Sequence, residues 1–244
     1  LDANKQPQHI YGFDGSLTLW NYDSDHNGKI DNANDKRILF FNMRRGGNAY
    51  YALDITSPDT PKILWKKARG DGGAWNNLGE TWSKPSLAKM RIGDTTTNVL
   101  KDVLVFGAGY DPAKDAETSR VADALGKDVI IVDALTGNIE WSLVDKLYGG
   151  SLGSSPIKHS IPGDIRVMDM DRNGALDRLY FADTGGNLWR VDMDKDIRDG
   201  DSTMYDYADA GLTKLADLGT GNNGSDYRKF FYEPDVALMQ YGGK

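Results

Sequence analysis

Val132-Asp133-Ala134-Leu135-Thr136-Gly137-Asn138-Ile139-Glu140-Trp141 reads as the end of one β-strand, a tight turn and a second strand. The side chains of Asp133 and Thr136 can accept hydrogen bonds from backbone amides in such a turn, and Gly137 can adopt a positive φ. Trp141 is expected to pack between neighbouring sheets. The pattern predicts one strand–turn–strand unit of an all-β protein.

The same pattern recurs in degenerate form along the chain. The other copies are Ile10-Tyr11-Gly12-Phe13-Asp14 followed by Trp20, Tyr50-Tyr51-Ala52-Leu53-Asp54 followed by Trp65, and Leu188-Trp189-Arg190-Val191-Asp192. Their aspartates lie roughly 40 to 80 residues apart, and propeller blades are about 40–50 residues long. The repeat therefore favours an incomplete or truncated β-propeller over a β-sandwich. We expect one domain over residues 1–244, a fragment of a longer domain with four to five blades' worth of chain.

Further segments between these repeats also have predicted structures. The additional strand signals are Val103–Gly107, Ile165–Met168, Leu179–Ala182 and Phe230–Tyr232. The one helix candidate is Ala113–Leu125, which we expect to be an insertion on one face of the propeller.

The composition limits the function. The chain has 244 residues, a net charge of −7 and no cysteine. The negative charge disfavours nucleic acid as a partner, and the absence of cysteine excludes disulfides and thiolate metal sites. No apolar run approaches the ~18 residues that span a bilayer. Divalent cations are plausible ligands wherever the carboxylates cluster.

Two nine-residue stretches have the pattern D-x-D-x-N-G-x-φ-D, where φ is apolar. The first loop is Asp23-Ser24-Asp25-His26-Asn27-Gly28-Lys29-Ile30-Asp31, and the second loop is Asp169-Met170-Asp171-Arg172-Asn173-Gly174-Ala175-Leu176-Asp177. Calcium prefers six to eight oxygen ligands, and a loop that turns sharply at glycine can supply them from alternate positions. The predicted ligands are Asp23, Asp25, Asn27, Lys29 and Asp31, and Asp169, Asp171, Asn173, Ala175 and Asp177. Lys29 and Ala175 would contribute only their backbone carbonyls. The sequence thus predicts two Ca²⁺ sites.

The flanks of both loops differ from those of EF-hands. Each loop lies between predicted strands, and position 12 is Asn34 or Tyr180 instead of the bidentate glutamate. Without that ligand we expect a modest affinity, about 0.1–1 mM, which favours a calcium-rich compartment outside the cytoplasm. The alternative is that Asp, Asn and Gly simply form good turns here, but two full matches argue against chance.

Several segments, in order, resemble one known family. They include Arg45 to Thr56, Leu78 to Pro85, Phe106 to Asp111, Ile161 to Asp177 and Asp183 to Arg190. Over about residues 8–240 the chain resembles the C-terminal domain of PilC/PilY-type proteins, the type IV pilus tip-associated adhesins and biogenesis factors. The resemblance implies a modified, quinoprotein-like propeller at the pilus tip or bacterial outer membrane surface. It also implies that calcium in the second loop governs pilus extension against retraction, with pilus tip subunits, assembly machinery or a host surface as partners.

The sequence is open to three other interpretations. The Asp-Ala-x-Thr-Gly repeat also occurs in quinoprotein dehydrogenases that hold pyrroloquinoline quinone, but the two loops have self-contained ligand sets and leave no open position for a cofactor. A non-enzymatic module is therefore favoured. Another interpretation is a passive structural domain, in which calcium only holds the loops in place. Arg69-Gly70-Asp71 forms a receptor-type tripeptide that a chain rich in Gly and Asp can contain by accident.

Overall fold

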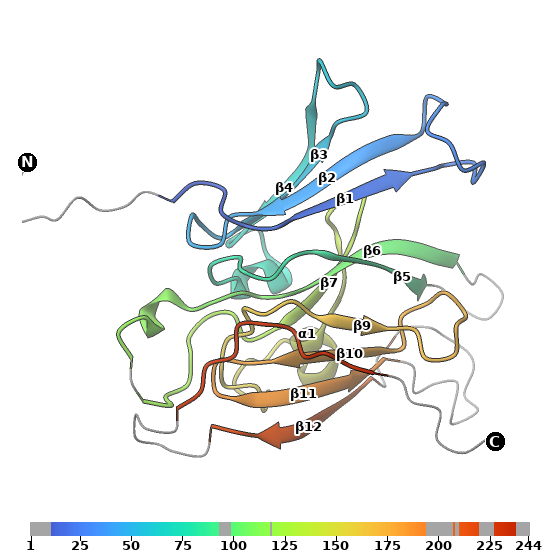
Figure 1. Ribbon diagram of the computed structural model, residues 1–244. Coiled ribbons are helices and arrows are strands. Elements are labelled where there is room, and N and C mark those ends of the chain that lie inside the picture. The colour runs from blue at the N-terminus through green and yellow to red at the C-terminus, as the bar shows by residue number, and fades with distance from the viewer. Residues whose placement is uncertain are drawn as a thin grey trace, which may run out of the picture.

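The computed structural model describes residues 11–92, 99–117, 119–193, 207, 210–219 and 227–237. These residues form three four-stranded antiparallel sheets, which succeed one another along the chain and lie one above the next (Figure 1). The all-β prediction is confirmed.

The bounds of the strands are as follows. The first sheet consists of β1 (Leu17–Tyr22), β2 (Lys36–Asn42), β3 (Ala49–Asp54) and β4 (Lys62–Ala68). The middle sheet consists of β5 (Ser86–Ile92), β6 (Val99–Gly107), β7 (Val129–Asp133) and β8 (Ile139–Ser142). The third sheet consists of β9 (Arg166–Met168), β10 (Arg178–Ala182), β11 (Asn187–Asp192) and β12 (Gly211–Asp217). In each sheet the strands pair in chain order.

Helix is scarce in the described part of the chain. It comprises the 3₁₀ turns Gly73–Asn77 and Pro112–Lys114 and one short α-helix, α1 (Leu143–Tyr148). The predicted helix over Ala113–Leu125 is wrong. The Asp111 side chain accepts hydrogen bonds from the amides of Ala113, Ala124 and Leu125, at 3.1, 2.7 and 3.3 Å, and so closes the segment into a loop.

Three further expectations differ from the structure. The described residues hold three sheets, not four to five blades, because long connections such as 108–128 and 143–165 lengthen each unit. Phe230–Tyr232 is not a strand; the Phe231 ring instead packs against Trp82 and Tyr110, with centroids 5.5 Å away from each. Tyr11 to Asp14, from the first repeat, is also not a strand, and Ile10 lies outside the described residues.

The middle sheet is buried on both faces. Ile130 and Val132 of β7 belong to a core shared with the first sheet, while Val129 and Ile131 belong to a core shared with the third. A strand that is covered on both sides needs a continuous apolar sequence, which explains the unbroken runs in β6 and β7. The apolar sequences of β6 and β7 thus explain why the middle sheet packs between the other two.

Backbone contacts also join the three sheets at one end. Isolated bridges pair Arg44 with Thr81, Glu80 with Tyr110, and Gly109 with Ile161. Tryptophans add contacts between sheets. Trp65 Nε1 donates to the carbonyl of Ala134 at 3.1 Å, across the first and middle sheets. Trp141 lies in the core between the middle and third sheets, as predicted.

Candidate metal centres

The two carboxylate loops occupy equivalent places in different sheets. The first loop follows β1 and leads toward β2, and the second connects β9 to β10. Both connect the first and second strands of their sheets and emerge on the same side of the molecule, at the right of Figure 1. The sequence repeat is therefore also a structural repeat.

The second loop is ordered by its own side chains. Asp169 accepts the amides of Asn173 and Gly174, at 3.2 and 2.9 Å on its two oxygens. Asp171 Oδ1 accepts the amide of Asn173 at 3.0 Å, and Asn173 Oδ1 accepts that of Ala175 at 2.8 Å. These bonds curl the backbone around one point and bring the acidic side chains together.

The first loop repeats this network position by position. Asp23 accepts the amides of Asn27 and Gly28, at 3.2 and 2.6 Å. Asp25 Oδ1 accepts the amide of Asn27 at 3.2 Å, and Asn27 Oδ1 accepts that of Lys29 at 2.8 Å. The same hydrogen bonds in two separate stretches with different flanking sequences indicate that the motif specifies its own conformation.

The backbone agrees at the two positions where the turn is sharpest. Position 4 is left-handed in both loops, with φ of 59° at His26 and 64° at Arg172. Position 6 has φ of 81° at Gly28 and 88° at Gly174. Glycine tolerates this region without steric cost, which is the physical reason for its place in the motif.

The two clusters differ in the position of the residue that supplies the third carboxylate. In the second loop, oxygens of Asp169, Asp171 and Asp177 lie within 4.8 Å of one another, so position 9 completes the group as the motif predicts. Around the first loop the group within 4.8 Å is Asp23, Asp25 and Asp35.

Asp31, the predicted ligand at position 9 of the first loop, is not in that group, although its Oδ1 accepts from Asn27 Nδ2 at 3.3 Å. Asp35 is almost fully buried and accepts the amides of Ser24, Asp31 and Asn32, at 3.0, 2.9 and 3.0 Å. It lies four residues beyond the motif. No motif in the sequence marks it as a candidate ligand, because it lies outside the nine-residue pattern.

The two completing carboxylates differ in their acidity. Burial raises the pKa of Asp177, and the nearby carboxylates of Asp171 and Asp169 raise it further, although the amides of Met170 and Asp171 oppose this. Burial would also raise the pKa of Asp35, but hydrogen bonds from the amides of Asn32 and Ser24 outweigh it and hold the pKa well below its usual range. The second loop therefore holds a carboxylate that a bound cation would help to ionise.

The donor set fits a hard divalent cation. Carboxylate and amide oxygens are the ligands that calcium prefers, and each cluster brings three carboxylates together. Across the described ranges, no lysine or arginine forms an ion pair with Asp169, Asp171 or Asp177. The nearby Arg91 donates from Nη2 to the carbonyl of Asn173 at 3.5 Å.

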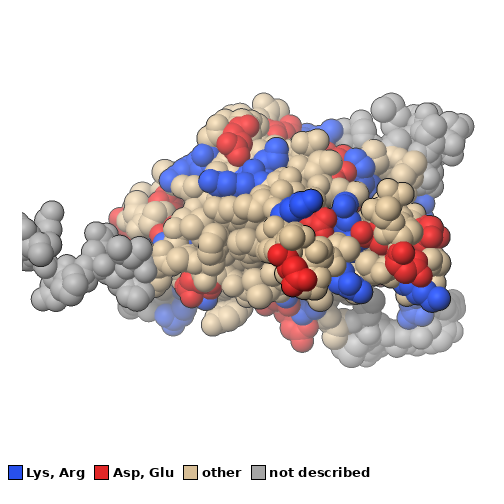
Figure 2. All heavy atoms as spheres, turned by 90° about the horizontal axis from the view of Figure 1, so that it is seen from above, with Lys and Arg blue, Asp and Glu red and all other residues tan. Residues whose placement is uncertain are grey.

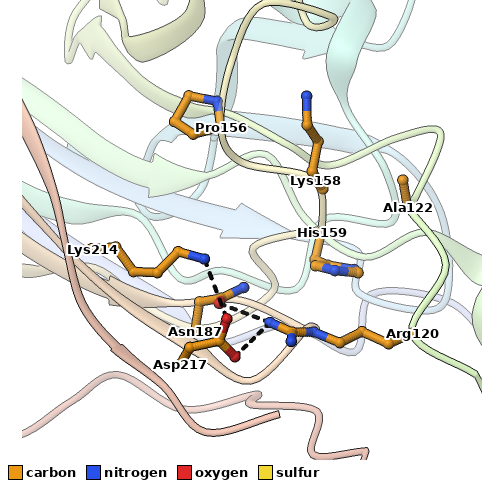
Figure 3. A pocket seen from close by; sticks show the side chains of 8 residues that line it. All are labelled: Arg120, Ala122, Pro156, Lys158, His159, Asn187, Lys214 and Asp217. Carbon is orange, nitrogen blue, oxygen red and sulfur yellow. Dashed lines mark hydrogen bonds and ion pairs between the residues drawn. The ribbon is translucent and has the colours of Figure 1, made fainter. Parts of the chain in front are cut away.

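A second candidate site is a polar cavity of about 410 Å³ beside the third sheet (Figure 3). Its cationic side chains are already partnered. Arg120 Nη2 contacts Asp217 Oδ1 at 2.8 Å and Asn187 Oδ1 at 2.9 Å, and Lys214 Nζ lies 3.4 Å from Asp217. Lys158 Nζ is held by the carbonyls of Gly153 and Ser155. The cavity therefore offers no cluster of free charges.

The Arg69-Gly70-Asp71 tripeptide is exposed, but its two charged ends are used within its own loop. Asp71 Oδ2 accepts the amide of Ala68 at 2.8 Å, and Arg69 Nη1 lies 3.4 Å from the carbonyl of Leu78. These contacts account for the tripeptide as a turn.

Comparison with known protein families shows which family has this sequence pattern. The family model described as the PilY1 beta-propeller domain matches residues 4–216, which hold all three sheets except the last residue of β12. The chain belongs to the PilY1 β-propeller family. The predicted resemblance and the propeller assignment are both confirmed.

PilY1 relatives are similar over most of this chain. The type IV pilus biogenesis factor PilY1 of Pseudomonas aeruginosa (strain UCBPP-PA14) is 29% identical over 164 residues, 67% of this chain and 12% of the relative. A PilY1 homolog of Xylella fastidiosa is 28% identical over 197 residues, 78% of this chain and 12% of the relative. The crystal structure of the Pseudomonas aeruginosa PilY1 C-terminal domain aligns with a TM-score of 0.50 and 26% identity. That alignment covers 74% of this chain and 30% of the solved one. The chain thus spans 12% of the length of the two PilY1 relatives from Pseudomonas aeruginosa and Xylella fastidiosa.

Proposed function

We propose that this chain is a calcium-binding propeller module of a type IV pilus biogenesis factor, and that calcium occupancy controls pilus extension against retraction and surface adhesion. The observation that supports it is the second loop, in which three carboxylates converge to within 4.8 Å and none forms an ion pair with a lysine or arginine that the structure describes. The family relation supports the connection to the pilus.

The residues of each loop would divide the work of binding. Asp169 and Asp171, or Asp23 and Asp25, supply carboxylate oxygens from a loop already curled by their own hydrogen bonds. The calcium ion supplies two positive charges that offset the repulsion among these groups. Because the cluster exists only in the folded chain, an ion bound there stabilises the folded state by mass action.

The location and partners follow from the same proposal. The module would act outside the cytoplasm, at the pilus tip or outer membrane surface, with pilus tip subunits, assembly machinery or a host surface as partners. In the part of the chain that the structure describes, no helix is both long enough and apolar enough to cross a membrane. The relatives are named as pilus biogenesis factors, so we propose a binding role without catalysis. No observation favours the quinone-dependent enzyme.

Calorimetry on the purified chain tests the calcium part. Millimolar Ca²⁺ should raise Tm, and a chelator should reverse the rise. At a hundredfold excess over Kd the stabilisation is about 2.7 kcal/mol per site. Magnesium at the same concentration is the control, since it demands a smaller, octahedral site. An unchanged Tm in 10 mM Ca²⁺ would refute calcium binding.

Piliation of the native host tests the control of the pilus. Asp169→Ala should abolish the calcium response of the second loop and impair the balance of extension and retraction. Asp59→Ala, at an exposed turn outside both clusters, is the matched control. Normal piliation with a folded Asp169→Ala protein would support a passive structural role for the ion.

A further inference from the structure

We propose that the polar cavity beside the third sheet binds a small neutral saccharide, a mono- or disaccharide. Its volume is about 410 Å³, within the range of about 300–1,000 Å³ that small-molecule sites occupy. The side chains that would recognise the ligand are Arg120, His159, Asn187, Lys214 and Asp217. No residue of either carboxylate loop lines the cavity, so the proposal does not depend on calcium binding.

Three parts of the chain meet at this cavity (Figure 3). Arg120 comes from the connection between β6 and β7, and His159 comes from the connection between α1 and β9. Asn187 begins β11 and Asp217 ends β12, and these two residues are paired across the strands. The fold thus brings together polar side chains that lie far apart in the sequence.

The side chains from the third sheet are held in place by buried partners. Asn187 Nδ2 donates to both carboxylate oxygens of Asp183, each at 2.9 Å, and Asn187 Oδ1 accepts from Arg120 Nη2 at 2.9 Å. Asp183 is fully buried and also accepts from Trp189 Nε1 at 2.8 Å. Arg120 Nη2 in turn contacts Asp217 Oδ1 at 2.8 Å. Polar groups that are fixed in advance lose little side-chain entropy when a ligand binds.

His159 adds a group of a different kind. It is only 6% exposed, and its Nδ1 lies 3.7 Å from Asp123 Oδ1. The ring packs so closely on Gly185 that a Cβ at this glycine would overlap it. Because Nδ1 faces a carboxylate, the neutral imidazole carries its proton on Nδ1. The other ring nitrogen, Nε2, is then an acceptor for a ligand in the cavity that His159 lines.

Buried polar atoms without a hydrogen-bond partner gather around this cavity. Among the residues that the structure describes there are six such side-chain atoms, and three of them belong to Arg120, Asp123 and His159. Arg120 and His159 line the cavity, and Asp123 faces His159. Native proteins pair nearly all of their buried polar atoms, and each exception calls for a reason. Several exceptions at one cavity indicate that these polar groups serve a function besides packing.

The charges of the cavity favour a neutral ligand that is rich in hydroxyl groups. Arg120 and Lys214 share the carboxylate of Asp217, at 2.8 and 3.4 Å, so an anion would have to compete with it. Basic and acidic side chains also lie side by side on the face seen in Figure 2, and the net charge of −7 opposes the approach of an anion. A hydroxyl group both donates and accepts hydrogen bonds, so it can join these pairs without displacing either charge. A saccharide carries several hydroxyl groups at fixed positions.

NMR of the histidine rings tests the proposal, because the chain has three histidines, His9, His26 and His159. The probes are galactose, N-acetylglucosamine and lactose, each added at up to about 10 mM to the chain in constant Ca²⁺. We expect the ring nitrogen signals of His159 to shift and saturate with at least one of these saccharides. The signals of His26, in the exposed first loop, should stay unchanged. The absence of a saturable shift with all three saccharides would overturn the proposal. An equal shift with glycerol, or a shift with inorganic phosphate alone, would overturn it as well.

Two variants test whether the ligand binds in this cavity. Asp217→Asn should weaken saccharide binding about tenfold, because a hydrogen bond to a charged group is lost while the shape of the side chain is kept. Asp192→Asn is the matched control, since Asp192 also pairs with arginines on the third sheet, Arg178 and Arg190, but does not line the cavity. Its affinity should equal that of the native chain. Lys214→Gln, which should also weaken binding, serves as a second site in case Asp217→Asn folds poorly. Equal affinities of the cavity variant and the control would overturn the assignment to this cavity.

Discussion

At the scale of single residues, Asp177 connects proton binding with metal binding. Its raised pKa means that in the metal-free protein a proton competes with the cation for this carboxylate. We expect the calcium affinity of the second loop to fall as pH is lowered, by up to about tenfold per pH unit for one displaced proton. Isothermal titration calorimetry on Asp23→Ala, which disables only the first loop, measures this. The reverse variant, Asp169→Ala, is the control. It leaves the first loop, where the pKa of Asp35 is held low, and its affinity should change less over the same range.

Asp128 is a second residue whose acidity affects the whole protein. It is fully buried, and burial raises its pKa to about 7, although bonds from Ser142 Oγ and the amide of Val144 oppose this. Between pH 4 and 7 the folded state therefore keeps a proton that the unfolded state has lost. Its contribution to stability falls as pH rises, by at most about 1.4 kcal/mol per pH unit, and is constant above pH 7. Denaturant unfolding at several pH values should show this slope for the native protein and not for Asp128→Asn. An identical slope in the variant would assign it to another group.

At the scale of elements, the second loop is also part of the contact between sheets. The amide of Leu176 donates to the carbonyl of Lys89 in β5 at 2.8 Å, and Arg91 of β5 reaches Asn173. Ordering this loop with calcium should therefore slow hydrogen exchange in β5, which belongs to the neighbouring sheet. Hydrogen-exchange mass spectrometry with and without calcium measures the effect. In Asp169→Ala, where only the first loop can respond, exchange in β5 should be insensitive to calcium. Protection confined to residues 169–177 in the native protein would contradict the coupling.

Elements with a strong periodic or apolar pattern could be predicted from the sequence, and those fixed by single side chains could not. The strands around Tyr50, Val105, Ile131 and Trp189 were identified correctly because their apolar runs reflect burial in the stack. The short helix α1 was missed. It is too short for periodicity, and its signals are a capping bond from the amide of Asp145 to Ser142 and a left-handed Gly149.

The sites show the same division. The local loops and their glycines were predictable because the motif dictates its own hydrogen bonds. Asp35 was not, because its approach to Asp23 and Asp25 depends on how the chain returns to β2. A tertiary contact of this kind leaves no spacing rule in the sequence. Whether the ions bind stays a prediction.

At the scale of the whole molecule, three sheets are held in order by a belt of close backbone contacts that only glycine permits. A Cβ at Gly109 would overlap the carbonyl oxygen of Glu80, and one at Gly79 would overlap that of Tyr110. These positions lie at two isolated bridges. Glu80 pairs with Tyr110 in the segments that flank β5 and β6 of the middle sheet, and Gly109 pairs with Ile161 in the segment that leads to the third sheet. Adding a single methyl group at one of these glycines should therefore lower the free energy of unfolding more than adding one at an exposed glycine with open space around it.

Gly109→Ala measures this sensitivity when it is compared with Gly70→Ala. Both glycines have φ near 100°, at 97° and 101°, so alanine suffers a similar backbone strain of about 1–2 kcal/mol at either position. A Cβ at Gly70 meets nothing within 4 Å, whereas at Gly109 it meets Glu80. The additional cost of overpacking is about 1–3 kcal/mol, and it should appear as a lower denaturant midpoint for Gly109→Ala alone. Because Gly109 also bridges Ile161, in the segment that leads to the third sheet, we also expect a loss of cooperativity, seen as a smaller m-value. Equal midpoints for the two variants would mean that the backbone around Gly109 can move to accommodate a methyl group. The hydrophobic cores alone would then determine how the sheets pack.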